Sequence, residues 1–204
     1  MKGDLSKVND PMDVVLSRPR GKLQQVLLIL LFAALFPALA CNAEPRPNQV
    51  LWKAVFNGNV DAVKTALSQG ADVNVRKGGW TVLMRVAGEG HTEIAQLLLA
   101  HTADPNAKGF GGETALTIAA EHGHTEIAKS LLTKGAEVNA KTQHGNTALH
   151  YGSEYGHRDV VKILLDAGAD VKQKDQEGET ALAIARRKNH AEIVQLLKSA
   201  ETKQ

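Results

Sequence analysis

A period of 33 residues runs through most of this chain and limits what it can fold into more than any other feature. Five columns (a glycine, a threonine, a leucine, a histidine and a second leucine) hold this spacing over four copies. They are Gly79, Gly112, Gly145 and Gly178; Thr81, Thr114, Thr147 and Thr180; Leu83, Leu116, Leu149 and Leu182; His91, His124, His157 and His190; and Leu98, Leu131, Leu164 and Leu197. A leading fifth copy fits with one residue less of spacing, and its matching residues are Leu51, Ala54, Gly58, Val63 and Leu67. Such a period is typical of solenoids, in which stacked units share one core.

The columns predict a helix–turn–helix unit. Each repeated threonine is suited to cap a first helix, because its hydroxyl can accept a hydrogen bond from a free backbone N–H. An acidic residue two places after each repeated histidine falls in the first turn of a second helix, where the helix dipole favours negative charge. These acidic residues are Glu93, Glu126, Asp159 and Glu192. Gly70, Gly135 and Gly168 follow the second helix, where a left-handed residue is needed.

These motifs resemble those of the ankyrin repeat family. The strings that carry the resemblance include Gly145-Asn146-Thr147-Ala148-Leu149-His150, Gly168-Ala169-Asp170-Val171 and Gly70-Ala71-Asp72-Val73-Asn74. The resemblance covers residues 47 to 200 and implies an all-α solenoid of helix–turn–helix units with short hairpin-like loops. The five predicted repeats are 49–76, 77–108, 109–141, 142–174 and 175–200, followed by a tail at 201–204.

Several positions depart from the family pattern. The proline that usually follows the capping threonine is replaced by Val82, Ala115, Ala148 and Ala181. In the first copy, Gln49 stands where the others have threonine. Trp52 and Tyr151 fall in packing columns and are predicted to be core. Thr102 occupies the post-helix glycine column, and a β-branched residue there predicts backbone strain.

The first 41 residues have the pattern of an export signal. Eleven uncharged apolar residues, 26–36, follow Arg18, Arg20 and Lys22 and precede the small-x-small triplet Ala38-Leu39-Ala40. This pattern predicts a signal peptide at 1–40 and a polar tether at 41–48. The string ending in Cys41 resembles a bacterial lipobox, which implies a lipid on Cys41, although Ala38 stands where leucine is usual.

Other interpretations of this leader stay open. Ordinary cleavage before Cys41 would leave a free or capped thiol. Leu23–Ala40 is 18 residues long and reaches the lower limit for a membrane span, so it also fits an uncleaved anchor. Translation from Met12 would shorten the long segment before the apolar run.

The charge balance excludes nucleic acid as a partner. Residues 1–41 carry five basic and three acidic side chains, and the remaining 163 residues carry 19 of each. A repeat region of zero net charge lacks the positive surface that drives nucleic-acid binding.

No catalytic, cofactor or metal site is predicted. The histidines recur once per repeat, so parallel side chains about 8–10 Å apart cannot converge on one metal ion. They are predicted to stabilise the turns by hydrogen bonds. His122, His124, His144 and Tyr155 are the weak alternative metal set. The run Gly109–Gly112 lacks the third glycine of a dinucleotide-binding loop.

The resemblance implies that a partner protein binds the concave face, formed by loop tips and the exposed side of each first helix. The residues predicted there are Lys77, Trp80, Phe110, Glu113, Glu121, His122, Gln143, His144, Asn146, Glu154, Tyr155, Gln176, Glu179, Arg187 and Lys188. The predicted function is that of a monomeric, non-catalytic protein-binding module, exported and lipid-anchored in the periplasm or cell envelope of a bacterium. The alternatives are an anchored adapter facing the cytoplasm and, less favoured, an enzyme or metal protein.

Overall fold

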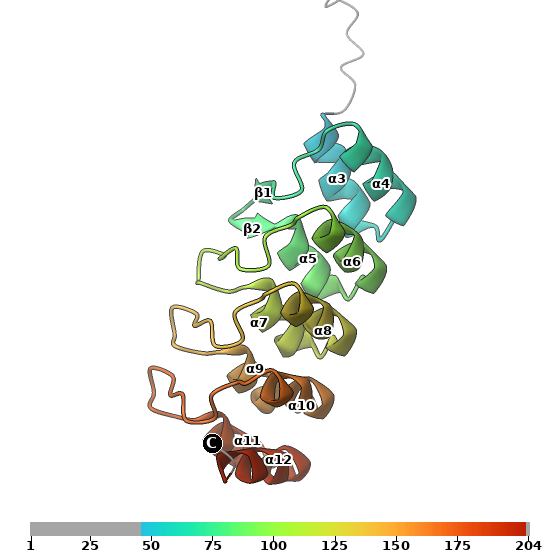
Figure 1. The fold of residues 1–204 in the computed structure, drawn as a ribbon. Coiled ribbons are helices and arrows are strands. Elements are labelled where there is room, and N and C mark those ends of the chain that lie inside the picture. The colour runs from blue at the N-terminus through green and yellow to red at the C-terminus, as the bar shows by residue number, and fades with distance from the viewer. Residues whose placement is uncertain (1–45, 203–204) are drawn as a thin grey trace, which may run out of the picture. The chain divides into compact units, whose positions relative to one another are not determined.

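The computed structural model describes residues 46–202, so the predicted signal peptide and Cys41 lie outside the described residues. The described part contains ten helices, which follow one another as five pairs, and one two-stranded hairpin (Figure 1). The pairs are α3 (Pro47–Phe56) with α4 (Val60–Ser68), α5 (Val82–Glu89) with α6 (Thr92–Ala100), α7 (Ala115–His122) with α8 (Thr125–Thr133), α9 (Ala148–Tyr155) with α10 (Arg158–Asp166), and α11 (Ala181–Arg187) with α12 (Ala191–Glu201). One pair falls in each predicted repeat, except that α3 begins two residues before residue 49 and α12 ends one residue after residue 200.

The pairs stack in two rows. In the first row α3 packs on α5, α5 on α7, α7 on α9 and α9 on α11, while the second row runs from α4 through α6, α8 and α10 to α12. The loops between pairs project from one side of the stack, beyond the first row (Figure 1). The first loop is the antiparallel hairpin of β1 (Arg76–Lys77) and β2 (Trp80–Thr81). This arrangement confirms the predicted all-α solenoid.

The repeated apolar and threonine columns do what their spacing predicts. The second-helix leucines, Leu98, Leu131, Leu164 and Leu197, are all completely buried. The Thr81, Thr114 and Thr180 hydroxyls each accept a hydrogen bond from the backbone N–H three residues later. Burial of one leucine contributes about 2 kcal/mol, so this column alone stabilises the stack substantially.

The first repeat differs from the prediction. Helix α3 begins at Pro47, before the expected cap position at Gln49, and Arg46 provides no side-chain cap. Proline suits this place because a helix's first N–H has no partner and the fixed φ of proline is already helical. Trp52 and Tyr151 are half-buried side chains packed against the core rather than members of it.

The repeated histidines join neighbouring repeats. The ring Nε2 of His124, His157 and His190 lies 3.2, 2.8 and 3.0 Å from the carbonyl oxygens of Gly88, Glu121 and Glu154, near the end of the preceding first helix. A carbonyl only accepts, so each Nε2 donates. The predicted turn-stabilising role is therefore performed between repeats and not within one.

Each of these rings lies on a turn glycine of the preceding repeat. A Cβ built on Gly123 would lie 2.5 Å from Nδ1 of His157, and Gly90 stands in the same relation to His124. Gly123 also has a φ of 75°. Glycine is thus required twice, by the backbone and by the ring above it. The last turn of this column has Asn189, with a φ of 63°.

Thr102 adopts the strained conformation that the sequence predicts. Its φ is 63°, and apart from Asn189 it is the only non-glycine residue with a positive φ between residues 46 and 202. Its counterparts Gly70, Gly135 and Gly168 have φ values of 85–86°. A Cβ on any of these three glycines would contact nothing within 4 Å, so the requirement at this column is conformational and not steric.

Thr102→Gly is therefore expected to stabilise the protein by about 1 kcal/mol, which is the relieved strain less the greater freedom of glycine in the unfolded chain. This corresponds to a rise of about 2–4 °C in Tm, measurable by calorimetry. The reciprocal variant Gly135→Thr should lower the Tm. A Tm for Thr102→Gly at or below that of the wild type would contradict the strain at this position.

Candidate functional site

All fifteen predicted partner-binding residues lie on the loops or near the ends of the first-row helices, and none is buried. We call the surface that they form the inner face. Nine are exposed, and Trp80, Glu113, Glu121, Asn146, Glu154 and Glu179 are half-buried. The prediction therefore identified accessible side chains, but several of them are engaged in contacts within the array.

Two glutamines of the inner face link successive loops. Gln143 Nε2 donates to the carbonyl of Phe110 at 2.7 Å, and Gln176 Nε2 donates to the carbonyl of Gln143 at 2.6 Å. Backbone bonds reinforce the link, because Gln143 N donates to Gly111 O and Gln176 N to His144 O. The residues 33 apart thus hold adjacent loops at a fixed spacing.

Several inner-face charges are paired within the array. Glu179 holds Arg187 through two bonds of 2.7 and 3.3 Å, and these contacts raise the pKa of the Arg187 guanidinium. Glu154 pairs with Lys188 at 3.0 Å. Glu113 accepts a bond from the Gly111 N–H of its own loop. These side chains are less available to a partner than their exposure suggests.

The aromatic side chains of the inner face remain accessible while resting on firm supports. Phe110 is 77% exposed, and its ring covers Gly79 of the preceding loop so closely that a Cβ on Gly79 would overlap the ring. Tyr155 is 51% exposed and stacks on His157, with ring centroids 6.4 Å apart. His122 stacks on His124 in the same way, at 6.1 Å. A supported ring loses little freedom on binding, which favours its use as an anchor.

The sequence did not predict a groove at the N-terminal end of the array. This N-terminal groove has a volume of about 840 Å³ and is formed by α3, α5 and the β1–β2 hairpin. Its lining residues are Asn48, Gln49, Trp52, Lys53, Phe56, Val75, Arg76, Lys77, Trp80 and Arg85. Two of the lining residues, Lys77 and Trp80, also belong to the predicted partner-binding set, and they lie directly opposite each other in the hairpin register.

Aromatic rings and positive charges together form the walls of the groove. Phe56 is 62% exposed, and the Arg85 guanidinium lies over its ring at 4.9 Å from the centroid. Arg85 also pairs with Glu89. Arg76 donates to the carbonyls of Gly79 and Lys108 and so ties the hairpin to the next loop. The lining contains four basic side chains and no acidic one.

His150, on α9, holds the loop between α10 and α11 in position. It is 2% exposed; its Nδ1 accepts from the Thr147 N–H at 3.2 Å, and its Nε2 lies 3.3 Å from the carbonyl of Glu179. These contacts require a neutral ring with the proton on Nε2. Burial lowers the pKa of His150 below its usual 6.5.

We expect His150 to make the protein less stable in mild acid. As pH falls below 6.5, His150 becomes protonated in the unfolded chain but stays neutral in the native protein, because its native pKa is lowered. The free energy of unfolding therefore decreases, by at most about 1.4 kcal/mol per pH unit, until the pH reaches that lowered native pKa. Urea unfolding between pH 7.5 and 5.0 should show a shallower loss in His150→Gln than in the wild type. His144→Gln controls for removing an imidazole, and identical slopes for the wild type and His150→Gln would contradict the assignment.

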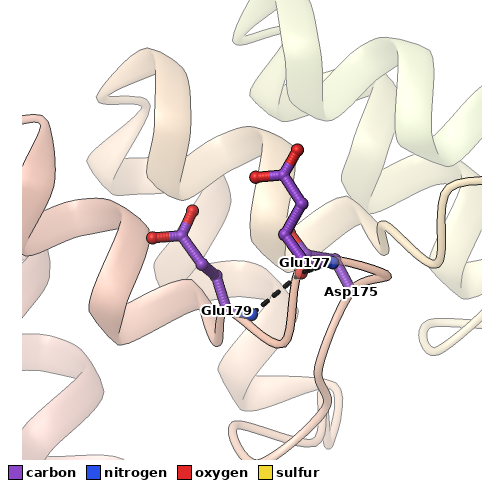
Figure 2. Close-up of side chains that lie close together, drawn as sticks. All are labelled: Asp175, Glu177 and Glu179. Atoms are coloured by element: carbon purple, nitrogen blue, oxygen red, sulfur yellow. Dashed lines mark hydrogen bonds between the residues drawn. The ribbon is translucent and has the colours of Figure 1, made fainter.

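Acidic side chains gather in the fourth loop. Carboxylate oxygens of Asp175, Glu177 and Glu179 lie within 4.8 Å of one another (Figure 2). Asp175 accepts from the backbone N–H groups of both Glu177 and Glu179, and Glu179 is bound by Arg187. The Asp175 and Glu179 carboxylates thus have structural roles, in holding the loop and in binding Arg187. The histidines weighed as a metal set are not part of it.

Comparison with known proteins identifies the family. A model described as ankyrin repeats (3 copies) matches residues 23–109 and 107–175. Human 2-5A-dependent ribonuclease is 45% identical over 60 residues, which is 28% of this chain and 8% of the ribonuclease. Human mitochondrial disaggregase is 38% identical over 77 residues, or 37% of this chain and 11% of the disaggregase. Human protein phosphatase 1 regulatory subunit 27 is 38% identical over 58 residues, or 28% and 38%.

The chain thus spans 8% to 38% of the length of these relatives, and the similarity is confined to repeats. No helix among residues 46–202 is long and apolar enough to cross a membrane. The family model covers well over half of the sequence, and the stacked helix pairs, capping threonines and bridging histidines agree with it. The chain therefore belongs to the ankyrin repeat family.

Proposed function

We propose that this protein is a non-catalytic interaction module that binds a partner protein through its inner face. Ankyrin repeats imply protein–protein interaction, and the ribonuclease and disaggregase similarities extend over 60 and 77 residues only, so they transfer no catalytic activity. One observation supports this face in particular. The large apolar side chains exposed between residues 46 and 202 are Phe56, Phe110 and Tyr155; Phe110 and Tyr155 belong to the inner face, and Phe56 lies on the first-row helix α3.

The rigidity of this side favours binding. The glutamine links and histidine bridges fix neighbouring loops and first helices before any partner arrives. Binding then costs little conformational entropy, and exposed aromatic residues are the side chains most often found at interface hot spots.

Alanine substitution of the inner-face aromatics tests the proposal. Trp80→Ala and Tyr155→Ala should each weaken binding of a partner captured from envelope extracts by more than about 1 kcal/mol, or roughly fivefold in Kd. Titration calorimetry with the purified partner measures the loss, and circular dichroism confirms folding. The exposed residue Gln96 on α6 supplies a control, Gln96→Ala. Unfolding of both aromatic variants with unchanged partner affinity would mean that the face is misassigned.

We further propose that the protein is exported and held at a bacterial envelope by a lipid on Cys41. The basic flank, the short apolar run and the small-x-small triplet before Cys41 support this location. Mass spectrometry of the mature N-terminus distinguishes the possibilities. Lipidated Cys41 supports the lipid anchor, free Cys41 supports simple cleavage, and an intact N-terminus supports an uncleaved anchor with the array facing the cytoplasm.

A further inference from the structure

We infer that the N-terminal groove binds an acidic segment of a partner protein, with carboxylates on Lys53 and Lys77 and an apolar side chain on Phe56 and Trp80. This inference rests on the proposed function and names the chemistry of the partner. The groove volume, about 840 Å³, lies within the range of ligand sites.

Of the four basic side chains of the groove, the two arginines are engaged in contacts within the array and the two lysines are not in ion pairs among the described residues. Arg76 is engaged with backbone carbonyls, and Arg85 pairs with Glu89. Lys53 and Lys77 are exposed and form no ion pair within residues 46–202. Two ammonium groups in a groove without carboxylates favour an anionic ligand, and this preference weakens as salt is added.

The hydrogen-bonding groups of the groove also point to acceptors. Trp52 Nε1 and Arg85 Nε are enclosed and have no hydrogen-bond partner in the described part of the chain. Both atoms are donors. Both are shielded from solvent, so the donors open to a ligand are the exposed Lys53 and Lys77 ammonium groups, which carboxylate and peptide carbonyl oxygens can match.

Three other occupants fit less well. The chain's own leader carries a net charge of two positive units in residues 1–41, so the groove repels it. The acidic loop of a second copy has its Asp175 and Glu179 carboxylates already engaged. A long nucleic acid laid along the inner face would meet Glu113 and Glu121 in the third repeat, whereas a short acidic peptide ends before them.

A random 12-residue peptide library selected on the full-length chain tests the inference. The selected peptides should be rich in Asp and Glu beside an aliphatic or aromatic residue. A synthetic peptide of the most frequent sequence should lose at least about tenfold in affinity for Lys53→Glu/Lys77→Glu. The matched control, Lys129→Glu/Lys162→Glu, makes the same charge change at exposed lysines on α8 and α10 and should bind as the wild type does. Melting curves verify that both variants are folded.

The remaining outcomes separate this inference from the proposed function. Peptides without acidic enrichment, an equal loss in the control variant, or equal binding of a 20-nucleotide single strand would overturn the acidic-segment inference. So would self-association, measured by sedimentation, that Lys53→Glu/Lys77→Glu abolishes. If binding responds to Tyr155→Ala but not to the lysine variant, the inner face stands and the groove fails. If binding responds to neither, both fail.

Discussion

Gly123→Ala is expected to lower the free energy of unfolding by about 3 kcal/mol, a large loss for a single added methyl group. Strain at a φ of 75° accounts for about 1–2 kcal/mol. The rest arises because the new Cβ would occupy the space of the His157 ring, 2.5 Å away, and break its bond to the Glu121 carbonyl. Urea denaturation measures the effect.

A second glycine separates the two causes. Gly135 has a φ of 85°, but a Cβ there would meet nothing within 4 Å, so Gly135→Ala should show only the backbone cost of about 1–2 kcal/mol. The His157→Ala background should reduce the cost of Gly123→Ala toward the same value, because the ring is gone. Equal losses for the two glycine variants in the wild-type background would show that the histidine yields freely.

Leu131→Ala is expected to cost about 2–5 kcal/mol, because it opens a cavity in the third repeat, between neighbours on both sides. Leu131 is completely buried on α8, which packs between α6 and α10. A cavity at Leu131 therefore weakens two interfaces at once, that of α8 with α6 and that of α8 with α10. Calorimetry should show one lowered transition if the array unfolds cooperatively.

The equivalent leucine of the last pair gives a contrasting result. Leu197 is equally buried on α12, which within residues 46–202 has a second-row neighbour on one side, α10. Leu197→Ala should therefore detach the terminal pair before the rest and broaden the transition instead of shifting it as a whole. A uniform shift in both variants would indicate that the array has no independent terminal unit.

The repeat period made the fold predictable. The threonine caps, the buried leucines and the left-handed glycines each follow from a local rule, and stacking is the one arrangement that buries their apolar faces together. Even the strained Thr102 could be identified, because its column contains glycine elsewhere. Column reasoning also located an accessible inner face.

The functions of individual inner-face residues were harder to predict. Gln143 and Gln176 share a column in which the two preceding copies have Lys77 and Phe110, and this variation marked the column as free for a partner. Both glutamines nevertheless donate to main-chain carbonyls. Because every residue has a main-chain carbonyl, the side-chain pattern of the sequence does not indicate which carbonyl accepts the hydrogen bond. His157 was assigned to its own turn for a related reason, since its acceptor lies 36 residues earlier.

The N-terminal groove was missed because the first copy departs from the period. It is one residue closer in spacing, and its helix starts at Pro47, so the repeat columns place Trp52 in the core and assign no role to Phe56. The cation–π contact of Phe56 with Arg85 joins two repeats and requires the stacking geometry. The surplus of aromatic and basic residues near residues 52–85 was the available signal.

Asn189 is the exception to the requirement for glycine in the turn between the two helices of a repeat. It stands in the column of Gly90, Gly123 and Gly156, and no histidine follows His190 within residues 46–202, so no ring of a later repeat covers Asn189 there. Asparagine tolerates the left-handed backbone, so the position accepts a side chain that its predecessors cannot. Adding a further repeat after α12 therefore requires Asn189→Gly, because the Asn189 side chain would otherwise clash with the histidine ring of the added repeat.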